Sequence, residues 1–366
     1  MNYLIAPNAF KGTIEADEAA AIISDTISKK FPEANIEQCP IADGGDGTCF
    51  LLGKELILPQ VDLYTLDPLG RSVSGFYFLD KTNKTAYLDV STVSGIKYLK
   101  EYEKNPWTAS TYGTGELIRN AISNGAKHIV LGLGGSATVD LGIGILNGLG
   151  YLFLDEKGRE MPIFSDVLFK NLRHIQSPVQ RQDIKITCLC DVNNYFFGEE
   201  GAIPVFGPQK GLDLNDFKEF QKSCSNVLDL LSTKSGKEIN DQPGFGAAGG
   251  IAFGLSFFFP VDIQMGAQWF FEKAGIEEKV KRSDTIITGE GKYDSQSAGG
   301  KGSYELLQIA KKHGKNIVLI TSGKGGNDAG FDEILILPDL DFDQADFQEN
   351  ARKNLVKCVE AWVESF

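Results

Sequence analysis

The sequence has little of what zinc-binding and membrane-spanning proteins need. Histidine occurs only three times in 366 residues, and no two histidines stand at the spacing of zinc ligands. The six cysteines are scattered without a Cys-x-x-Cys pair, as expected for reduced thiols in a cytoplasmic protein. The most apolar stretch, 249–261, is shorter than the roughly 18 residues of a spanning helix, and the first residues do not resemble a secretory signal. We therefore expect a cytoplasmic protein with no membrane partner.

Positive charge is also in short supply. The chain has 49 acidic and 36 basic side chains, and the resulting formal charge of −13 repels nucleic-acid backbones. We therefore expect no nucleic-acid partner, while local basic pockets remain available for small anions. The fractions of hydrophobic residues (42%) and charged residues (23%) are ordinary for a globular protein, and the length suggests two domains.

Short apolar runs rich in β-branched residues alternate with helical patterns along the chain, which predicts an α/β fold with mostly parallel strands. The expected strands are 3–6, 36–41, 76–79, 85–90, 128–133, 184–190, 285–288, 317–321 and 334–337. Thr13 is expected to cap a helix whose inner face carries Ala19, Ile23, Ile27 and Phe31. Further helices are expected at 114–124 and around 217–231.

The distribution of these elements predicts two α/β domains. Segments 1–62 and 283–366 together supply five strands and four helices, which is enough for a flavodoxin-like, doubly wound parallel sheet. Residues 63–282 would then form an inserted, mixed α/β domain that starts with a turn at 67–70 and two antiparallel strands. This organisation predicts a ligand-binding cleft between the domains, and it leaves a homodimer open.

Glycine is the one residue in excess, with 41 copies, and it gathers in loops after the expected strands. In a parallel α/β sheet such loops meet at the carboxyl ends of the strands, where ligands bind. Glycine allows backbone N–H groups to approach an anion closely, so phosphate is the natural ligand. Any one of these loops could be a simple turn, and it is their combination that carries the prediction. The loops are 8–12, 42–48, 132–138, 190–194, 289–294 and 299–303.

The same loops carry side chains of both charges. The carboxylates are Asp43, Asp46, Asp191, Glu290 and Asp294, and the glycine-flanked lysines are Lys11 and Lys301. Phosphoryl transfer uses such a set, because lysines hold the polyphosphate while carboxylates hold Mg²⁺ and accept the proton of the attacking hydroxyl. Asp43 and Asp191 could instead be helix caps, and Lys210 could be either a third cation or a turn residue.

Other nucleotide and hydrolase signatures are absent or incomplete in this chain. No G-x-x-x-x-G-K-[ST] string and no G-x-S-x-G string occur, which excludes a Walker-type phosphate loop and disfavours a serine hydrolase. Gly132, Gly134 and Ala137 match a dinucleotide-binding loop, with Asp155 after the next apolar run. The alternative function is therefore an NAD(P)-dependent oxidoreductase of a small hydroxy acid, although glycines interrupt the helix that this loop should open. A non-catalytic binding protein would leave the acidic loops unexplained.

These loops, in this order, resemble the type 1 glycerate kinase family over essentially the whole chain. The matching stretches are 5–12, 40–48, 110–118, 131–138, 190–194, 205–211, 246–250 and 287–291. The chain departs from the family pattern where Asn8, Leu141 and Lys292 stand, because the family usually has Asp, Gly and Arg at these places.

The resemblance implies that ATP phosphorylates D-glycerate, at the 2-hydroxyl, to give 2-phosphoglycerate, with ATP and Mg²⁺ as cofactors. The residues expected to be catalytic are Asp191, Asp43 and Lys11. Those expected to bind the nucleotide are Gly134, Gly135, Ser136, Gly300 and Lys301. The substrate is expected to contact Lys11, Lys210 and Lys292, and the metal to be held by Glu290 and Asp294.

Overall fold

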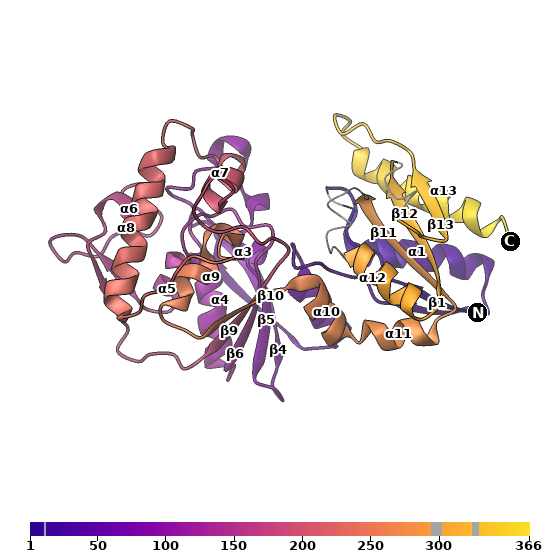
Figure 1. The fold of residues 1–366 in the computed structure, drawn as a ribbon, viewed down its shortest axis with the longest axis horizontal. Helices are drawn as coiled ribbons and strands as arrows, with labels where there is room; N and C mark the ends of the chain where they lie inside the picture. The colour runs from indigo at the N-terminus through magenta and orange to yellow at the C-terminus, as the bar shows by residue number, and fades with distance from the viewer. Residues whose placement is uncertain (11, 294–301, 324–328) are drawn as a thin grey trace. The chain divides into compact units, whose positions relative to one another are not determined.

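A computed structural model describes residues 1–10, 12–293, 302–323 and 329–366, which divide into two compact units (Figure 1). We call residues 1–43 with 266–366 the terminal unit and residues 44–265 the inserted unit. The terminal unit contains β1 (Asn2–Ile5), α1 (Ala16–Lys30), β2 (Asn35–Gln38), α10 (Gly266–Ala274), α11 (Ile276–Arg282), β11 (Thr285–Lys292), α12 (Gly302–Lys312), β12 (Asn316–Ser322), β13 (Glu333–Leu337) and α13 (Phe347–Val363).

The inserted unit contains more and shorter elements. Its strands are β3 (Gln60–Leu66), β4 (Ser72–Asp80), β5 (Thr85–Asp89), β6 (His128–Gly132), β7 (Leu152–Leu154), β8 (His174–Gln176), β9 (Lys185–Cys190) and β10 (Val261–Met265). Its α-helices are α2 (Thr48–Glu55), α3 (Ser91–Ser94), α4 (Tyr112–Ser123), α5 (Ile143–Gly148), α6 (Leu168–Asn171), α7 (Ala202–Phe206), α8 (Phe217–Ser235) and α9 (Ile251–Ser256). Four 3₁₀ turns are η1 (Ile96–Tyr98), η2 (Glu101–Glu103), η3 (Pro208–Lys210) and η4 (Ala247–Gly249).

The terminal unit is built on one parallel sheet in the order β13-β12-β11-β1-β2. Counted along the chain from the β2 edge, this is the flavodoxin-like order 2-1-3-4-5, whose switch point lies between the first and third strands. The predicted α/β fold class, with a flavodoxin-like sheet, is confirmed. The switch point therefore falls between β1 and β11.

Helices cover both faces of this sheet. On one face α1 packs against α13, and Ile5 and Val318 meet Ile23 and Leu355 in one core (Figure 1). On the other face α11 packs against β1, and α12 packs against β11 and β12.

The predicted inner stripe of α1 is confirmed for Ala19, Ile23 and Ile27, which are fully buried. Phe31, the last member of the predicted stripe, is the C-terminal cap residue of α1. The predicted cap at Thr13 is wrong, because Glu15 precedes the helix while Thr13 Oγ1 donates to the carbonyl oxygen of Phe10 at 2.7 Å.

The inserted unit has a six-stranded mixed sheet in the order β10-β9-β6-β5-β4-β3, in which β4 runs antiparallel to β3 and β5. Alternate residues of β4 face opposite helices. Phe76 and Phe78 pack against Phe50 of α2, with ring centroids 6.0 and 6.3 Å from that of Phe50. Tyr77 faces the other way and donates its hydroxyl to Asn120 of α4 at 2.8 Å. A small antiparallel pair, β7 and β8, stands apart from this sheet.

Along the chain, the boundaries between the two units fall at 43/44 and 265/266, whereas the predicted domain boundaries lie at 62/63 and 282/283. Contacts of α2 explain the first difference, because Asp89 at the end of β5 accepts hydrogen bonds from Cys49 N (3.0 Å) and Phe50 N (2.9 Å). Contacts of α11 with β1 and α12 explain the second. The existence of two separately folding domains stays a prediction. Among the described residues, no helix has both the length and the apolar character needed to cross a bilayer.

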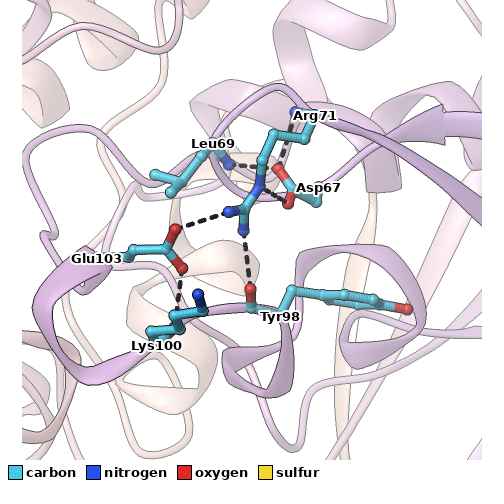
Figure 2. A network of polar contacts seen from close by, with 6 residues as sticks. All are labelled: Asp67, Leu69, Arg71, Tyr98, Lys100 and Glu103. Carbon is cyan, nitrogen blue, oxygen red and sulfur yellow. Dashed lines mark hydrogen bonds and ion pairs between the residues drawn. The ribbon is translucent and has the colours of Figure 1, made fainter.

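A polar network fixes the turn between β3 and β4 (Figure 2). The buried Asp67 carboxylate accepts hydrogen bonds from the backbone N–H groups of Leu69 and Arg71, both at 2.9 Å. The Arg71 guanidinium donates to Asp67 (2.6 Å), Glu103 (2.8 Å) and the carbonyl oxygen of Tyr98 (2.8 Å). One arginine thus ties the turn to the segment that contains η1 and η2. The first residue of η1, Ile96, in turn lines a pocket at the carboxyl end of β6.

Candidate functional site

A pocket of about 570 Å³ lies in the terminal unit, at the switch point of its sheet. The last residues of β11 and β12 and the segments after β1, β2 and β13 line it, so it lies at the carboxyl ends of the strands, where doubly wound sheets bind ligands. Its polar wall includes Asn8, Asp43, Glu290, Lys292 and Ser322. We call it the acidic pocket, because two carboxylates line it. They belong to Asp43 and Glu290, which are only 8% and 6% exposed.

Backbone pairing brings Asp43 to this pocket. Beyond the end of β2 the chain continues beside β1, where Ile41 N donates to the carbonyl oxygen of Pro7 at 2.9 Å. Asn8 is held on its other side by Gly289, whose carbonyl oxygen accepts from Asn8 N at 2.8 Å. The Asn8 side-chain amide then donates to Asp43 Oδ2 at 3.2 Å. An amide at this position can therefore orient the carboxylate, whereas a second carboxylate would repel it.

Glu290 lies at an irregularity of the sheet, since the pairing of β11 with β12 shifts register between Glu290 and Lys292. Lys292 is exposed at the pocket edge. The next residue, Tyr293, is buried, and burial together with the Glu290 charge raises its pKa to about 12. Tyr293 therefore keeps its proton at neutral pH and does not act as a base.

Apolar side chains also line the acidic pocket. They come from the β1–α1 connection, from the end of β13 with the segment after it, and from α13, and they are Phe10, Ile14, Leu337, Pro338, Leu340, Phe342 and Ala351. A pocket with both carboxylates and apolar side chains suits a ligand with a charged part and a flat apolar part.

A second pocket, of about 260 Å³, lies in the inserted unit at the carboxyl ends of β6 and β9. These strands pair in parallel, so the loop 133–136 and Asp191 reach the same edge of the sheet. Further walls come from η3, through Gln209 and Lys210, and from η4, through Ala247 and Ala248. We call it the glycine pocket, since Gly134 and Gly135 form part of its lining.

The glycines of this pocket allow a very close backbone approach. A Cβ atom at Gly134 would lie 2.1 Å from the carbonyl carbon of Gly45 and 2.2 Å from Asp46 N, which no side chain can satisfy. Gly135 has a φ of +69° and lies against Asp46, which is hydrogen-bonded to Ser91. Asp46 is thus a structural neighbour of the loop and not part of either pocket lining.

Lys210 is the buried cation of the glycine pocket. It is only 4% exposed, and its ammonium group donates to Ser136 Oγ and to the carbonyl oxygen of Thr138, both at 2.8 Å. Burial lowers the pKa of Lys210 to about 7, and the charge of Asp140 opposes this shift. The sequence left Lys210 undecided between a cation and a turn residue; the structure places it as a buried amine in the pocket.

Sequence reasoning missed two features behind this pocket. Asp140 is 2% exposed and accepts from Thr111 N (2.8 Å), Thr111 Oγ1 (2.7 Å), Gly142 N (3.1 Å) and Gly144 N (3.2 Å). Ala248 has a left-handed backbone (φ +49°), which is unfavourable for a residue with a Cβ and is typical of functional sites. The glycine-rich stretch 246–250 was a visible signal for Ala248, but nothing in the sequence marked Asp140 as buried.

The structure thus sorts the predicted site residues into two groups. Asp43, Glu290 and Lys292 share the acidic pocket. The residues in the glycine pocket are Gly134, Gly135, Ser136, Asp191 and Lys210. Lys11, Asp294, Gly300 and Lys301 lie outside the described residues.

The acidic pocket fits a magnesium ion in its donor chemistry. Among the described residues, no three His, Cys, Asp or Glu side chains gather as a complete metal site. Mg²⁺ in nucleotide enzymes needs only one or two carboxylates, since phosphate and water oxygens complete its shell. Asp43 and Glu290 provide two such carboxylates.

The dinucleotide alternative is not favoured by the structure. In that motif the glycine loop opens directly into a helix, whereas here β6 ends at Gly132 and α5 begins only at Ile143 and lasts six residues. Asp155, the expected ribose ligand, instead closes a local turn, where it accepts from Arg159 N at 2.9 Å and Arg159 Nε at 2.8 Å.

Comparisons with known proteins agree with these observations. Residues 3–366 match the model of the Glycerate kinase family. A glycerate kinase from Haemophilus influenzae is 35% identical over 87% of this chain and 85% of its own length, and one from Halalkalibacterium halodurans is 33% identical over 99% of each. A glycerate 2-kinase from Escherichia coli is 32% identical over 90% of this chain and 87% of its own. A crystal structure assigned to glycerate kinase 2 from Salmonella typhimurium LT2 matches 100% of this chain and 98% of that chain, with a TM-score of 0.83 and 29% identity. The chain therefore belongs to the glycerate kinase family of enzymes.

Proposed function

We propose that this enzyme transfers the γ-phosphoryl group of ATP to the 2-hydroxyl of D-glycerate and releases 2-phosphoglycerate, with Mg²⁺ as cofactor. The observation that carries the proposal is the acidic pocket, where two nearly buried carboxylates share the switch point of a flavodoxin-like sheet. Buried carboxylates are costly to maintain, and a metal-bound polyphosphate gives them a function. The E. coli relative, a glycerate 2-kinase, supports the 2-hydroxyl as acceptor.

In this proposal the acidic pocket takes Mg·ATP. Its volume and apolar lining residues suit a nucleoside, while Glu290 and Asp294 would hold the metal. When bound, the metal would neutralise charge on the phosphate oxygens. Lys11, Gly300 and Lys301 are proposed to hold the polyphosphate, with Lys292 as a further cation at the pocket edge.

The glycine pocket is proposed to hold anionic oxygens of the reacting groups. Its small volume suits a three-carbon acid or a single phosphoryl group, and Gly134, Gly135, Ser136 and Lys210 supply close backbone and hydrogen-bond donors. Asp191 or Asp43 is proposed as the base that accepts the hydroxyl proton. Lys11 would stabilise the transferring phosphoryl group.

The decisive experiment is an ADP-coupled assay with D-glycerate, L-glycerate, glycolate, lactate and hydroxypyruvate, followed by phosphorus NMR of the product. We expect ADP release with D-glycerate and a resonance of 2-phosphoglycerate. A 3-phosphoglycerate resonance would correct the position, and absence of ADP release with every acid would reject the function. Titration with NADH and Mg·ATP under thermal unfolding adds a check, since only the true ligand should raise Tm.

The proposal also covers the cellular compartment and the oligomeric state of the enzyme. Five of the six cysteines are buried and none is in a disulfide, which suits a reducing compartment, so we propose the cytoplasm. Sedimentation analysis of the purified chain would decide between a monomer and a homodimer.

A further inference from the structure

The hydrogen bonds of Lys210 are unusual for a buried ammonium group. Its two acceptors, Ser136 Oγ and the Thr138 carbonyl oxygen, are neutral, and no carboxylate among the described residues lies within ion-pair distance of its Nζ. Lys is almost never fully buried without a charged partner, because desolvation of the ammonium is expensive. The ammonium group of Lys210 therefore has no carboxylate bonded to it, although Asp191 lines the same pocket.

The hydrogen bond from Lys210 also determines whether Ser136 can donate its own hydroxyl proton. A serine hydroxyl has one proton to donate and lone pairs to accept with. In its protonated form Lys210 can only donate, so Ser136 Oγ then accepts from it and keeps its own proton for another group. Among the described residues no acceptor for that proton is found, and Ser136 lines the pocket beside Gly134 and Gly135. The hydroxyl proton is thus available to a ligand in the glycine pocket.

The surroundings of Lys210 leave room for one more negative charge. The charge of Asp140 acts on Lys210, and the titratable residues that line the same pocket are Asp191 and Cys190. Burial raises the pKa of Asp140, whose oxygens are occupied by four hydrogen bonds from other groups. Burial also raises the pKa of Cys190 to about 11, so this thiol stays protonated at neutral pH. Asp191 also lines the pocket.

We propose that Lys210 is a positioning residue that holds Ser136 as a donor toward an anionic oxygen in the glycine pocket, and that it takes up a proton from solvent when this anion binds. The inference rests on the proposed function for the identity of the anion, which is either a carboxylate oxygen of the acid substrate or a phosphate oxygen. An anion beside the amine supplies a negative charge and favours its protonated form. Binding and protonation are therefore linked, and each strengthens the other.

The test measures proton uptake by calorimetric titration in two buffers of different ionisation enthalpy. The probes are D-glycerate and sulfate, which carry the two candidate kinds of oxygen and do not titrate between pH 6 and 8.5. With the amine titrating near pH 7 in the free enzyme, we expect uptake of about one proton per bound anion at pH 8.5 and about 0.1 at pH 6. The Kd should weaken by about tenfold per pH unit above pH 7.5. Uptake with only one probe identifies the source of the oxygen.

Three single variants and one double variant separate positioning from direct contact. Lys210→Arg keeps a permanent charge and should bind without proton uptake and without the pH slope. Lys210→Met should bind weakly at every pH. Ser136→Ala should lose about ten- to hundredfold in affinity, since a hydrogen bond to a charged group is lost. The double variant Lys210→Met with Ser136→Ala should bind no more weakly than Lys210→Met alone, because each change removes the same hydrogen bond from Ser136 to the anion.

The control is Lys234→Met on the exposed end of α8, which should match the wild type in affinity, proton uptake and pH slope. Thermal unfolding of each variant checks the fold, and Lys210→Arg keeps the test valid if Lys210→Met is unstable. Binding without proton uptake, additive losses in the double variant, or no binding of either probe would each overturn the inference. Turnover of the wild-type enzyme with D-glycerate is measured separately, so failure of the proposed function is seen on its own.

Discussion

The two pockets hold opposite charges by opposite means. In the acidic pocket, Asp43 is oriented by a side-chain amide, that of Asn8, and reaches its place through regular strand pairing. In the glycine pocket, the Lys210 ammonium donates to a hydroxyl and to a carbonyl oxygen. The backbone of Gly134 packs directly against the backbone of Gly45. The first arrangement positions a carboxylate for a cationic ligand, and the second positions donors for an anionic one.

This difference indicates how each pocket should respond to substitution. A carboxylate placed by strand pairing tolerates changes around it, because the sheet holds the backbone. A loop that depends on contact between Gly134 and Gly45 tolerates no added atom, and its function depends on the protonation of Lys210 as well. Substitutions in the acidic pocket should therefore act on the chemistry, and substitutions in the glycine pocket on structure and pH dependence.

The largest expected effect distinguishes the two candidate bases. Asp43→Asn and Asp191→Asn keep the shape of the side chain and remove its basicity. The variant that lacks the true base should lose about 10² to 10⁴ in kcat, because general-base catalysis contributes this much. Steady-state kinetics with D-glycerate would decide, with circular dichroism to check the fold. If both variants keep near-normal kcat, neither pocket supplies the base through these residues.

A smaller effect should follow from adding one methyl group to the glycine pocket. Gly134→Ala places a Cβ 2.1 Å from the carbonyl carbon of Gly45, so one of the two loops must move. We expect a loss of about 1–3 kcal/mol in the free energy of unfolding, the usual range for overpacking, together with a raised KM. Urea unfolding and kinetics would measure both.

Gly236→Ala serves as the matched control for this substitution. Gly236 ends α8 with a φ of +70° and open space around it, so alanine there meets only backbone strain, of about 1 kcal/mol. A loss no larger for Gly134→Ala than for Gly236→Ala would contradict the close-fit interpretation of the glycine pocket.

The sequence predicted the terminal unit better than the inserted one. The buried parallel strand β12 has a continuous apolar run, and β11 has a shorter one at Ile286 and Ile287; the sheet order followed from the doubly wound pattern. By contrast, β3 alternates exposed and partly buried residues at the sheet edge, and β10 is only partly buried, so both escaped prediction. Edge strands carry a weak hydrophobic signal because one side faces solvent.

The same contrast holds for the site. The glycine and acid clusters marked loops such as 132–138 and 289–294, since these residue types are visible in the sequence. The backbone conformation of individual residues could not be predicted from the sequence. Leu141 is fully buried with a φ of +53°, at a place where the family usually has glycine, and its side chain packs against Gly250. A leucine gives no sign that its backbone is left-handed, and this geometry is fixed by tertiary packing.

The smallest effect concerns Asp89, which caps α2 behind the glycine pocket. Burial, with a contribution from the Asp46 charge, raises the pKa of Asp89 to about 7, although hydrogen bonds from Cys49 N and Phe50 N oppose the shift. The native state therefore binds a proton that the unfolded chain releases near pH 3.8. This group's contribution to stability is full below pH 3.8 and is lost as the pH rises through 7.

Asp89→Asn should remove this dependence, because the amide does not titrate. As the pH rises, the unfolding free energy of the wild type minus that of the variant should then fall. The steepest fall, about 1 kcal/mol per pH unit, is expected between pH 5 and 7. Urea unfolding at four pH values would measure it, with Asp80→Asn as control, since hydrogen bonds lower the pKa of Asp80 and its effect has the opposite sign. A difference that stays flat from pH 4 to 8 would mean that Asp89 is ionised throughout. The inserted unit would then carry a buried negative charge at the start of α2, held by the N–H groups of Cys49 and Phe50.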